Sequence, residues 1–181
     1  TNLSGEIGHI FAADNGIRCQ CGRTGCLETV AGSPAVLQRL RSGLEKGEFP
    51  LLRRSVEAGR QLDIQLLIEA AAMGDSDAAA EISMAGNSVG TAISAAVTLL
   101  NPSKIIFSGA ITAAPLFQKS VLEELHNRCF PESLKFLQLA FQPQNSEFDA
   151  KAAASLAYER CFGLSPDERR ELSRFGPVGI I

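Results

Sequence analysis

A cluster of metal-binding residue types near the start of the chain constrains its fold more than any other feature. One imidazole and three thiols fall within 18 residues, at His9, Cys19, Cys21 and Cys26. Three thiolates and a neutral imidazole form a closed tetrahedral shell in structural zinc sites, so these four residues predict a bound zinc ion. Two carboxylates, Glu6 and Glu28, flank the set. Because the tetrahedron is complete without them, they are free for another role.

Disulfide bonds are a poor alternative for these thiols. The chain has five cysteines, an odd number, and three of them lie within eight residues. A bridge between Cys19 and Cys21 would close a very short, strained ring. Secreted chains that rely on disulfides usually spread an even set along their length. We therefore expect reduced thiols in a cytoplasmic protein, with Cys129 and Cys161 as packing residues.

The distribution of charge argues against direct contact with nucleic acid or a membrane. The net charge is −3, and the Lys and Arg residues are scattered, whereas a DNA-binding surface carries a basic stripe. The apolar stretch from Ala78 to Leu100 has the length of a membrane span, but Glu81 and Asn87 interrupt it. We expect this stretch to be a buried helix, and no membrane partner.

Three segments are expected along the chain: a glycine-rich metal loop at 1–32, a helix-rich α/β lobe at 33–163 and a tail at 164–181. Apolar spacing and breaker residues predict helices at about 33–44, 63–73, 76–100, 115–129 and from 149, with buried strands at 104–108 and 137–141. Two strands are too few for a self-sufficient sheet, so we expect the chain to be part of a larger molecule.

Several local features carry predictions of their own. Ser33 is predicted to be the N-cap of the helix that follows it. The charged, aperiodic residues 43–62 are predicted to be an irregular connection between helices. Gly86 and Gly90 are predicted to allow close packing of the long helix against a neighbour, and His126 is expected on the surface.

The glycines and acids around the ligands resemble the signature of the ROK family, which comprises repressors, open reading frames and sugar kinases. The matching residues are Gly5-Glu6-Ile7-Gly8-His9 and Cys19-x-Cys21-Gly22-x-x-Gly25-Cys26-Leu27-Glu28. Gly74-Asp75 and the run from Leu100 to Ile106 look like later family segments. The resemblance covers roughly residues 5 to 160.

This resemblance implies the C-terminal lobe of an actin-like ATPase (ribonuclease H-like) fold, incomplete without its N-terminal lobe. It also implies that His9, Cys19, Cys21 and Cys26 hold a structural zinc, and that Glu6, His9 and Glu28 bind a sugar. Carboxylates accept hydrogen bonds from vicinal hydroxyls, and an imidazole can use its second nitrogen in the same way. The zinc would keep the loop rigid so that the acids face one sugar ring. The resemblance further implies a homo-oligomer.

The sugar kinases of this family need residues that these 181 positions do not contain. A kinase needs a DxGxT phosphate loop and a catalytic Asp that takes the proton from the sugar hydroxyl. Asp14-Asn15-Gly16 is interpreted as a turn and not as that catalytic motif. Ser108-Gly109-Ala110 and the segment 147–151 also depart from the pattern of the kinases. No catalytic residue is assigned, and ATP is expected only if the protein is a kinase.

Three functional hypotheses follow. The preferred one is the sugar-sensing effector part of a ROK-type transcriptional regulator, because Cys26–Ala31 and the segment 43–62 look more like the repressor branch. Such a protein would bind DNA only through an N-terminal winged helix-turn-helix. The alternative is the C-terminal lobe of an ATP-dependent ROK sugar kinase. A free-standing zinc module that binds nucleic acid or protein is less favoured, since acidic residues oppose Arg18 and Arg23 near the cluster.

Overall fold

The computed structural model describes residues 5–13 and 16–142, together with residues 154 and 163. The chain divides into two units, Thr1–Pro143 and Gln144–Ile181. The account below concerns the first unit. The helix predicted from residue 149, Cys161 and the tail predicted at 164–181 lie outside the described residues.

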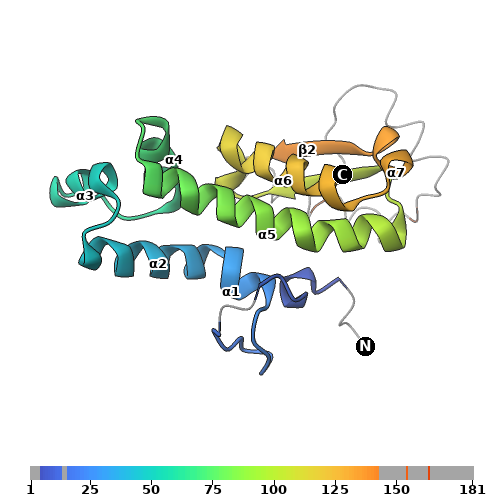
Figure 1. Ribbon diagram of the computed structural model, residues 1–181, viewed down its shortest axis with the longest axis horizontal. Coiled ribbons are helices and arrows are strands. Elements are labelled where there is room, and N and C mark those ends of the chain that lie inside the picture. Colours follow the sequence, from blue (N-terminus) through green and yellow to red (C-terminus); the bar gives the residue numbers. More distant parts are fainter. Residues whose placement is uncertain (1–4, 14–15, 143–153, 155–162, 164–181) are drawn as a thin grey trace. The chain divides into compact units, whose positions relative to one another are not determined.

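Helices make up most of the described chain, and two strands form a small sheet (Figure 1). In chain order the elements are η1 (Ile7–His9), α1 (Leu27–Ala31), α2 (Ser33–Lys46), α3 (Pro50–Glu57), α4 (Ile64–Ala72), α5 (Ser76–Leu100), β1 (Lys104–Ser108), η2 (Ala110–Ala113), α6 (Pro115–Arg128), α7 (Pro131–Lys135) and β2 (Gln138–Gln142). The predicted α/β class is confirmed. The helices predicted at 33–44, 63–73, 76–100 and 115–129 and both strands are confirmed to within a few residues at each end.

Two local predictions were wrong. Residues 43–62 contain the helix α3, whose Leu52 is fully buried in the core. Ser33 is the first residue of α2, and Gly32 takes the N-cap position. Gly32 also ends α1, and a Cβ on it would lie 2.5 Å from the carbonyl oxygen of Glu28, so only glycine fits between these two helices.

A buried carboxylate joins the starts of two helices. Asp75 is 1% exposed, and its Oδ1 accepts hydrogen bonds from the backbone N–H groups of Asp77 and Ala78, at the start of α5. Its Oδ2 accepts from the N–H groups of Leu51 and Leu52, at the start of α3. The N–H groups of a helix's first turn have no partner within the helix. One side chain therefore caps α5 and fixes α3 beside it.

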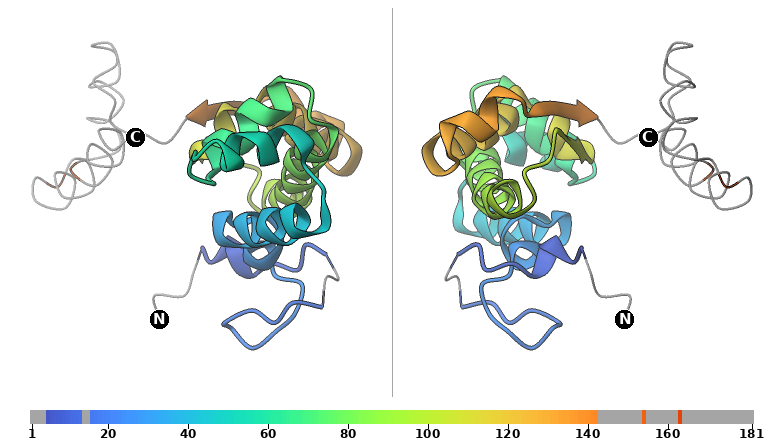
Figure 2. Two further views of the ribbon diagram at one scale, coloured as in Figure 1. Left: turned by 90° about the vertical axis from the view of Figure 1, so that its left-hand side faces the viewer. Right: turned by 90° about the vertical axis from the view of Figure 1, so that its right-hand side faces the viewer.

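The long helix α5 lies at the centre of the unit. Figures 1 and 2 show α1 and α2 along one side of it, and α6 with the sheet along the other. Two glycines let α6 approach closely: a Cβ on Gly86 would lie 2.7 Å from Cβ of Ser120, and one on Gly90 would lie 2.6 Å from Cβ of Glu124. Real Cβ contacts are never this short, so the predicted role of these two glycines in helix packing is confirmed.

Helix α5 has 25 residues and is apolar enough to cross a membrane by length and composition. Its position in the unit is that of a core helix, in contact with α1, α4 and α6. The buried Glu81 accepts a hydrogen bond of 3.0 Å from Nε of Arg39, on α2. This ion pair ties α5 to α2 and accounts for a charge within an apolar helix.

The sheet consists of β1 and β2, which run parallel with Phe107 opposite Phe141. Their rings stack with centroids 4.8 Å apart, and Phe117 of α6 meets Phe141 edge-on at 6.5 Å. Helix α6 is the crossover between the two strands, as parallel pairing requires. The sheet is thus fixed to α6, and through α6 to the central helix α5.

Candidate metal centre and the adjoining hollow

The cysteine loop is shaped by a tight turn that brings distant thiols together. The N–H of Gly22 donates to the carbonyl of Cys19 at 2.9 Å, and the N–H of Cys19 donates to the carbonyl of Arg23 at 2.7 Å. Gly22 has φ +89°, a value that favours glycine. Arg18 and Thr24 form an antiparallel bridge across the turn. The turn therefore returns the chain past Cys19 and Cys21 toward Cys26.

A second glycine is required where the loop crosses its own earlier part. Gly25 has φ +76°, and its carbonyl accepts a 2.8 Å hydrogen bond from the N–H of Ala12. A Cβ at Gly25 would lie 2.5 Å from both the carbonyl oxygen of Ala13 and the ring of Phe11. Neither the backbone angle nor the space admits a side chain. Gly22 and Gly25 of the sequence pattern thus serve the shape of the loop.

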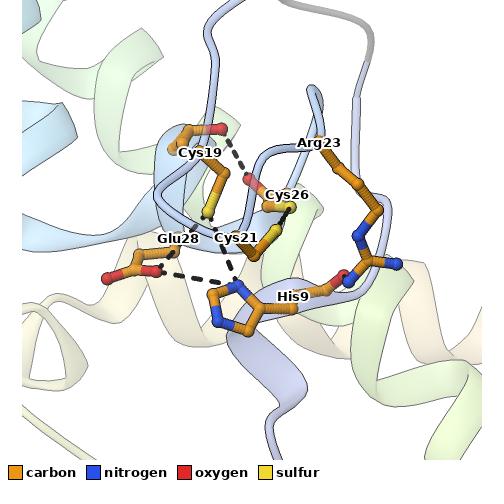
Figure 3. A network of polar contacts seen from close by, with 7 residues as sticks. His9, Cys19, Cys21, Arg23, Cys26 and Glu28 are labelled. Atoms are coloured by element: carbon orange, nitrogen blue, oxygen red, sulfur yellow. Dashed lines mark hydrogen bonds and ion pairs between the residues drawn. The ribbon is translucent and has the colours of Figure 1, made fainter.

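The loop gathers the four predicted ligands, and their ligand atoms all lie within 4.8 Å of one another (Figure 3). Sγ of Cys19 lies 3.5 Å from Nδ1 of His9, and Sγ of Cys21 lies 3.5 Å from Sγ of Cys26. Zn–S bonds of about 2.3 Å and Zn–N bonds of about 2.0–2.1 Å imply ligand atoms about 3.3–3.8 Å apart in a tetrahedron. The donor set fits zinc, the two 3.5 Å separations match such a tetrahedron, and all three thiols are free of disulfides.

Two of the thiols have opposite pKa shifts. The backbone N–H and then the side chain of Arg23 hydrogen-bond to Cys21 and lower its pKa to about 6. Burial is the main cause that raises the pKa of Cys26 to about 11. Cys21 is exposed and Cys26 is buried. Without a metal, Cys21 is therefore mostly thiolate at neutral pH, while Cys26 keeps its proton.

We predict that this difference controls alkylation of the metal-free protein. Iodoacetamide at pH 7 should modify Cys21 well before Cys26, because the thiolate is the nucleophile and Cys21 is accessible. As the pH falls through about 6, the rate at Cys21 should fall because its thiolate is protonated. Peptide mass spectrometry after chelation checks the order, and zinc added back should protect both residues. Faster labelling of Cys26 than of Cys21 would contradict the order of pKa values given for these two thiols.

The two carboxylates lie near the four predicted ligand residues. Glu28 is in the first turn of α1, and its Oε2 lies 3.8 Å from Nδ1 of His9 and 3.9 Å from Sγ of Cys19. Glu6 precedes the short helix η1, which carries His9 at its end. The guanidinium of Arg23 donates to the carbonyl of His9 at 3.1 Å and ties η1 to the cysteine loop. Figure 3 shows Nδ1 of His9 directed toward the sulfur atoms and Glu28.

An open hollow of about 390 Å³ adjoins the cluster. Its lining residues are Glu6, Gly8, His9, Leu27, Glu28, Ala31, Gly32 and Val89. The structure thus brings the three predicted sugar contacts, Glu6, His9 and Glu28, to one concave surface. Val89 was missed in the sequence, since it lies on α5, far along the chain, and no motif marks it. His126 is exposed on α6, as expected.

Comparisons with known proteins identify relatives of this chain. The chain is 35% identical over 152 residues to the "DNA-binding transcriptional dual regulator NagC" of Escherichia coli, covering 82% of this chain and 35% of that protein. It is 26% identical over 162 residues to the "Glucokinase" of Thermotoga maritima, covering 89% of this chain and 51% of the enzyme. The chain spans about a third of the length of the curated regulators it matches.

A solved ROK family transcriptional regulator, a homologue of the Escherichia coli Mlc protein, has a similar structure. The TM-score is 0.67 at 32% sequence identity, with coverage of 76% of this chain and 34% of that one. The ROK family profile itself matches residues 1–155, which is most of the chain. The chain therefore belongs to the ROK family.

Proposed function

We propose that this chain is the sugar-sensing effector part of a ROK-type transcriptional regulator. In this proposal it forms the C-terminal lobe of an actin-like fold, His9, Cys19, Cys21 and Cys26 hold a structural zinc, and Glu6, His9 and Glu28 bind a sugar. The observation that carries the proposal is the position of the hollow, which shares His9 with the metal cluster and has both carboxylates in its lining.

In this proposal the zinc holds the loop rigid and takes no part in any reaction of the sugar. Bound zinc keeps four protein ligands in a closed tetrahedral shell, with no position left for substrate. Of the described residues before α1, only Cys19, Gly25 and Cys26 are buried, so the loop has little apolar packing of its own. With Nδ1 of His9 facing the sulfurs, Nε2 remains the ring nitrogen available to a ligand.

The three polar side chains suit the hydroxyl groups of a sugar. The carboxylates of Glu6 and Glu28 can each accept hydrogen bonds from neighbouring hydroxyls. Hydrogen bonds that involve a charged group are stronger than neutral ones, which favours a fixed orientation of the ligand. The hollow has a volume of about 390 Å³, which is within the range of small-molecule sites and large enough for one sugar unit.

The regulator branch is favoured over the kinase branch by the relatives. The NagC regulator is 35% identical to the chain, against 26% for the Thermotoga maritima glucokinase. Under this proposal the protein is cytoplasmic and homo-oligomeric and binds DNA through an N-terminal winged helix-turn-helix. Under the kinase alternative, which the glucokinase match keeps open, the N-terminal lobe would supply the phosphate loop and catalytic Asp, and ATP would bind.

Metal analysis and ligand titration of the full-length protein test the proposal. We expect about one zinc per chain and an increase in melting temperature with at least one unphosphorylated or phosphorylated hexose or N-acetylhexosamine, without ATP. Added sugar should also change the affinity for operator DNA. Transfer of phosphate from ATP to the sugar would select the kinase alternative. A protein that binds zinc but none of these sugars would refute the proposed sugar site.

We predict that Gly8→Ala separates sugar binding from folding. A Cβ at Gly8 would meet only Cβ of Glu28, at an ordinary distance of 3.6 Å, so the fold should accept it. Because Gly8 lines the hollow, an added methyl there should weaken sugar binding by at least about tenfold. Calorimetry measures the affinity, with zinc content and melting temperature as controls. Unchanged affinity would place the ligand elsewhere.

A further inference from the structure

The lining of the hollow divides into two chemical classes. Glu6, His9 and Glu28 offer hydrogen bonds, whereas Leu27, Ala31 and Val89 offer only hydrocarbon. Val89 differs from the other lining residues because it comes from the central helix α5 and not from residues 6–32. The hollow thus joins a polar loop to an apolar helix surface.

We propose that Val89 is a specificity-determining residue, the apolar wall against which one face of a pyranose ring packs. The inference rests on the proposed sugar site and adds the basis on which that site selects among epimers. A pyranose has hydroxyls around its rim and C–H groups on its faces. The carboxylates can bind the rim, and the side chain of Val89 can cover a C–H face.

The chemistry of valine makes this wall selective. Its two methyl groups neither donate nor accept a hydrogen bond, so a hydroxyl that pointed at them would lose water without gaining a partner. An apolar site of this kind rejects an added hydroxyl by about ten- to a hundredfold. An epimer whose axial hydroxyl faces Val89 should therefore bind more weakly than one that presents only C–H groups there.

The position of the wall is fixed by the packing of α5. Val89 is half-buried and packs against the hydrophobic core, and a β-branched side chain in a helix has essentially one χ1 rotamer. Gly86 and Gly90, on either side of it in sequence, bring the backbone of α5 against α6 with no room for a Cβ. Neither rotation of the side chain nor withdrawal of the helix can open space for a misplaced hydroxyl.

The test uses the zinc-loaded full-length protein and Val89→Thr, which keeps the shape of the side chain and adds a hydroxyl. Dissociation constants are measured for glucose, mannose, allose and galactose and for the N-acetyl derivatives of glucosamine, mannosamine and galactosamine, each with and without a 6-phosphate. We expect the ratio of Kd values between at least one epimer and its parent sugar to change by about tenfold. Val89→Ala should lower the affinity for the preferred sugar and reduce the same discrimination.

Val56→Thr is the matched control, because Val56 is also half-buried against the core but lies on α3, away from the hollow. Val56→Thr should leave every ratio of Kd values between epimers unchanged. If the wild-type protein binds a sugar but both Val89 variants keep all ratios within twofold, the inference is overturned and the proposed function stands. If the wild-type protein binds no member of the panel, the proposed sugar site fails and the role of Val89 fails with it.

Discussion

Cys21→Ala is expected to release the zinc and to destabilise residues 5–26, so that this loop opens far more often than in the zinc-bound protein. Structural zinc contributes about 10–16 kcal/mol in isolated zinc fingers, and a shell reduced to three ligands binds far more weakly. Cys21 is exposed, so its replacement costs little packing, and the effect isolates the loss of the metal. The zinc content measured by elemental analysis should fall from about one ion per chain to none. Hydrogen exchange should become fast in the loop and stay slow in α5 and α6.

Gln20→Ala is the control for this variant, since Gln20 is exposed and adjacent but offers no ligand atom. It should keep the zinc and the slow exchange of the loop. The loss of metal in Cys21→Ala should also abolish sugar binding, because His9 and Glu28 depend on the loop for their positions. Full zinc occupancy in the Cys21 variant would show that the cluster is not the metal site.

Asp75→Ala is expected to destabilise the helical part of the unit strongly. The variant leaves four backbone N–H groups at the starts of α3 and α5 without their acceptor. Hydrogen bonds to a charged group contribute about 1.5–3 kcal/mol each, and an N-cap about 0.5–2. Water can replace the carboxylate as acceptor for some of these N–H groups. We therefore expect the free energy of unfolding to fall by about 3–5 kcal/mol, less than the sum of the separate hydrogen bonds. Urea denaturation measures the loss.

Two further variants make the test specific. Asp63 caps α4 alone, through a 2.7 Å hydrogen bond from the N–H of Leu66, and it is exposed. Asp63→Ala should therefore cost only about 1 kcal/mol. Asp75→Asn keeps one acceptor oxygen and can cap only one of the two helices, so α3 or α5 should lose protection in hydrogen exchange. If Asp75→Ala costs no more than Asp63→Ala, the double cap contributes nothing beyond an ordinary one.

Local chemistry explains why much of this structure could be predicted from the sequence. The long helix is bounded by Asp75 at its start and by Asn101-Pro102 at its end, and these signals act over one turn of chain. The ligand residues could be identified because thiols and imidazole at this spacing have few other uses. The structure brings their ligand atoms together. The zinc ion and the bound sugar remain predictions until they are measured.

The features that were missed depend on contacts between distant residues. Helix α3 is short and rich in charge, and the acids that cap its first turn lie well beyond its end, at Asp75 and Asp77. No pattern within residues 43–62 records those partners. Val89 reaches the hollow only because α5 packs on α1. A helical apolar stripe predicts burial, but it does not identify which member faces a ligand.

Gly86 and Gly90 have a mechanical consequence. Helices that pack through long side chains can slide, because rotamers adjust to the shift. At Gly86 and Gly90 the backbone of α5 lies directly against the Cβ atoms of Ser120 and Glu124 of α6, so no long side chain separates the helices at these two points. We therefore expect the two helices to resist sliding past one another at these two points. The same close contact links the helix that lines the hollow to α6, and Phe117 of α6 contacts Phe141 of the sheet.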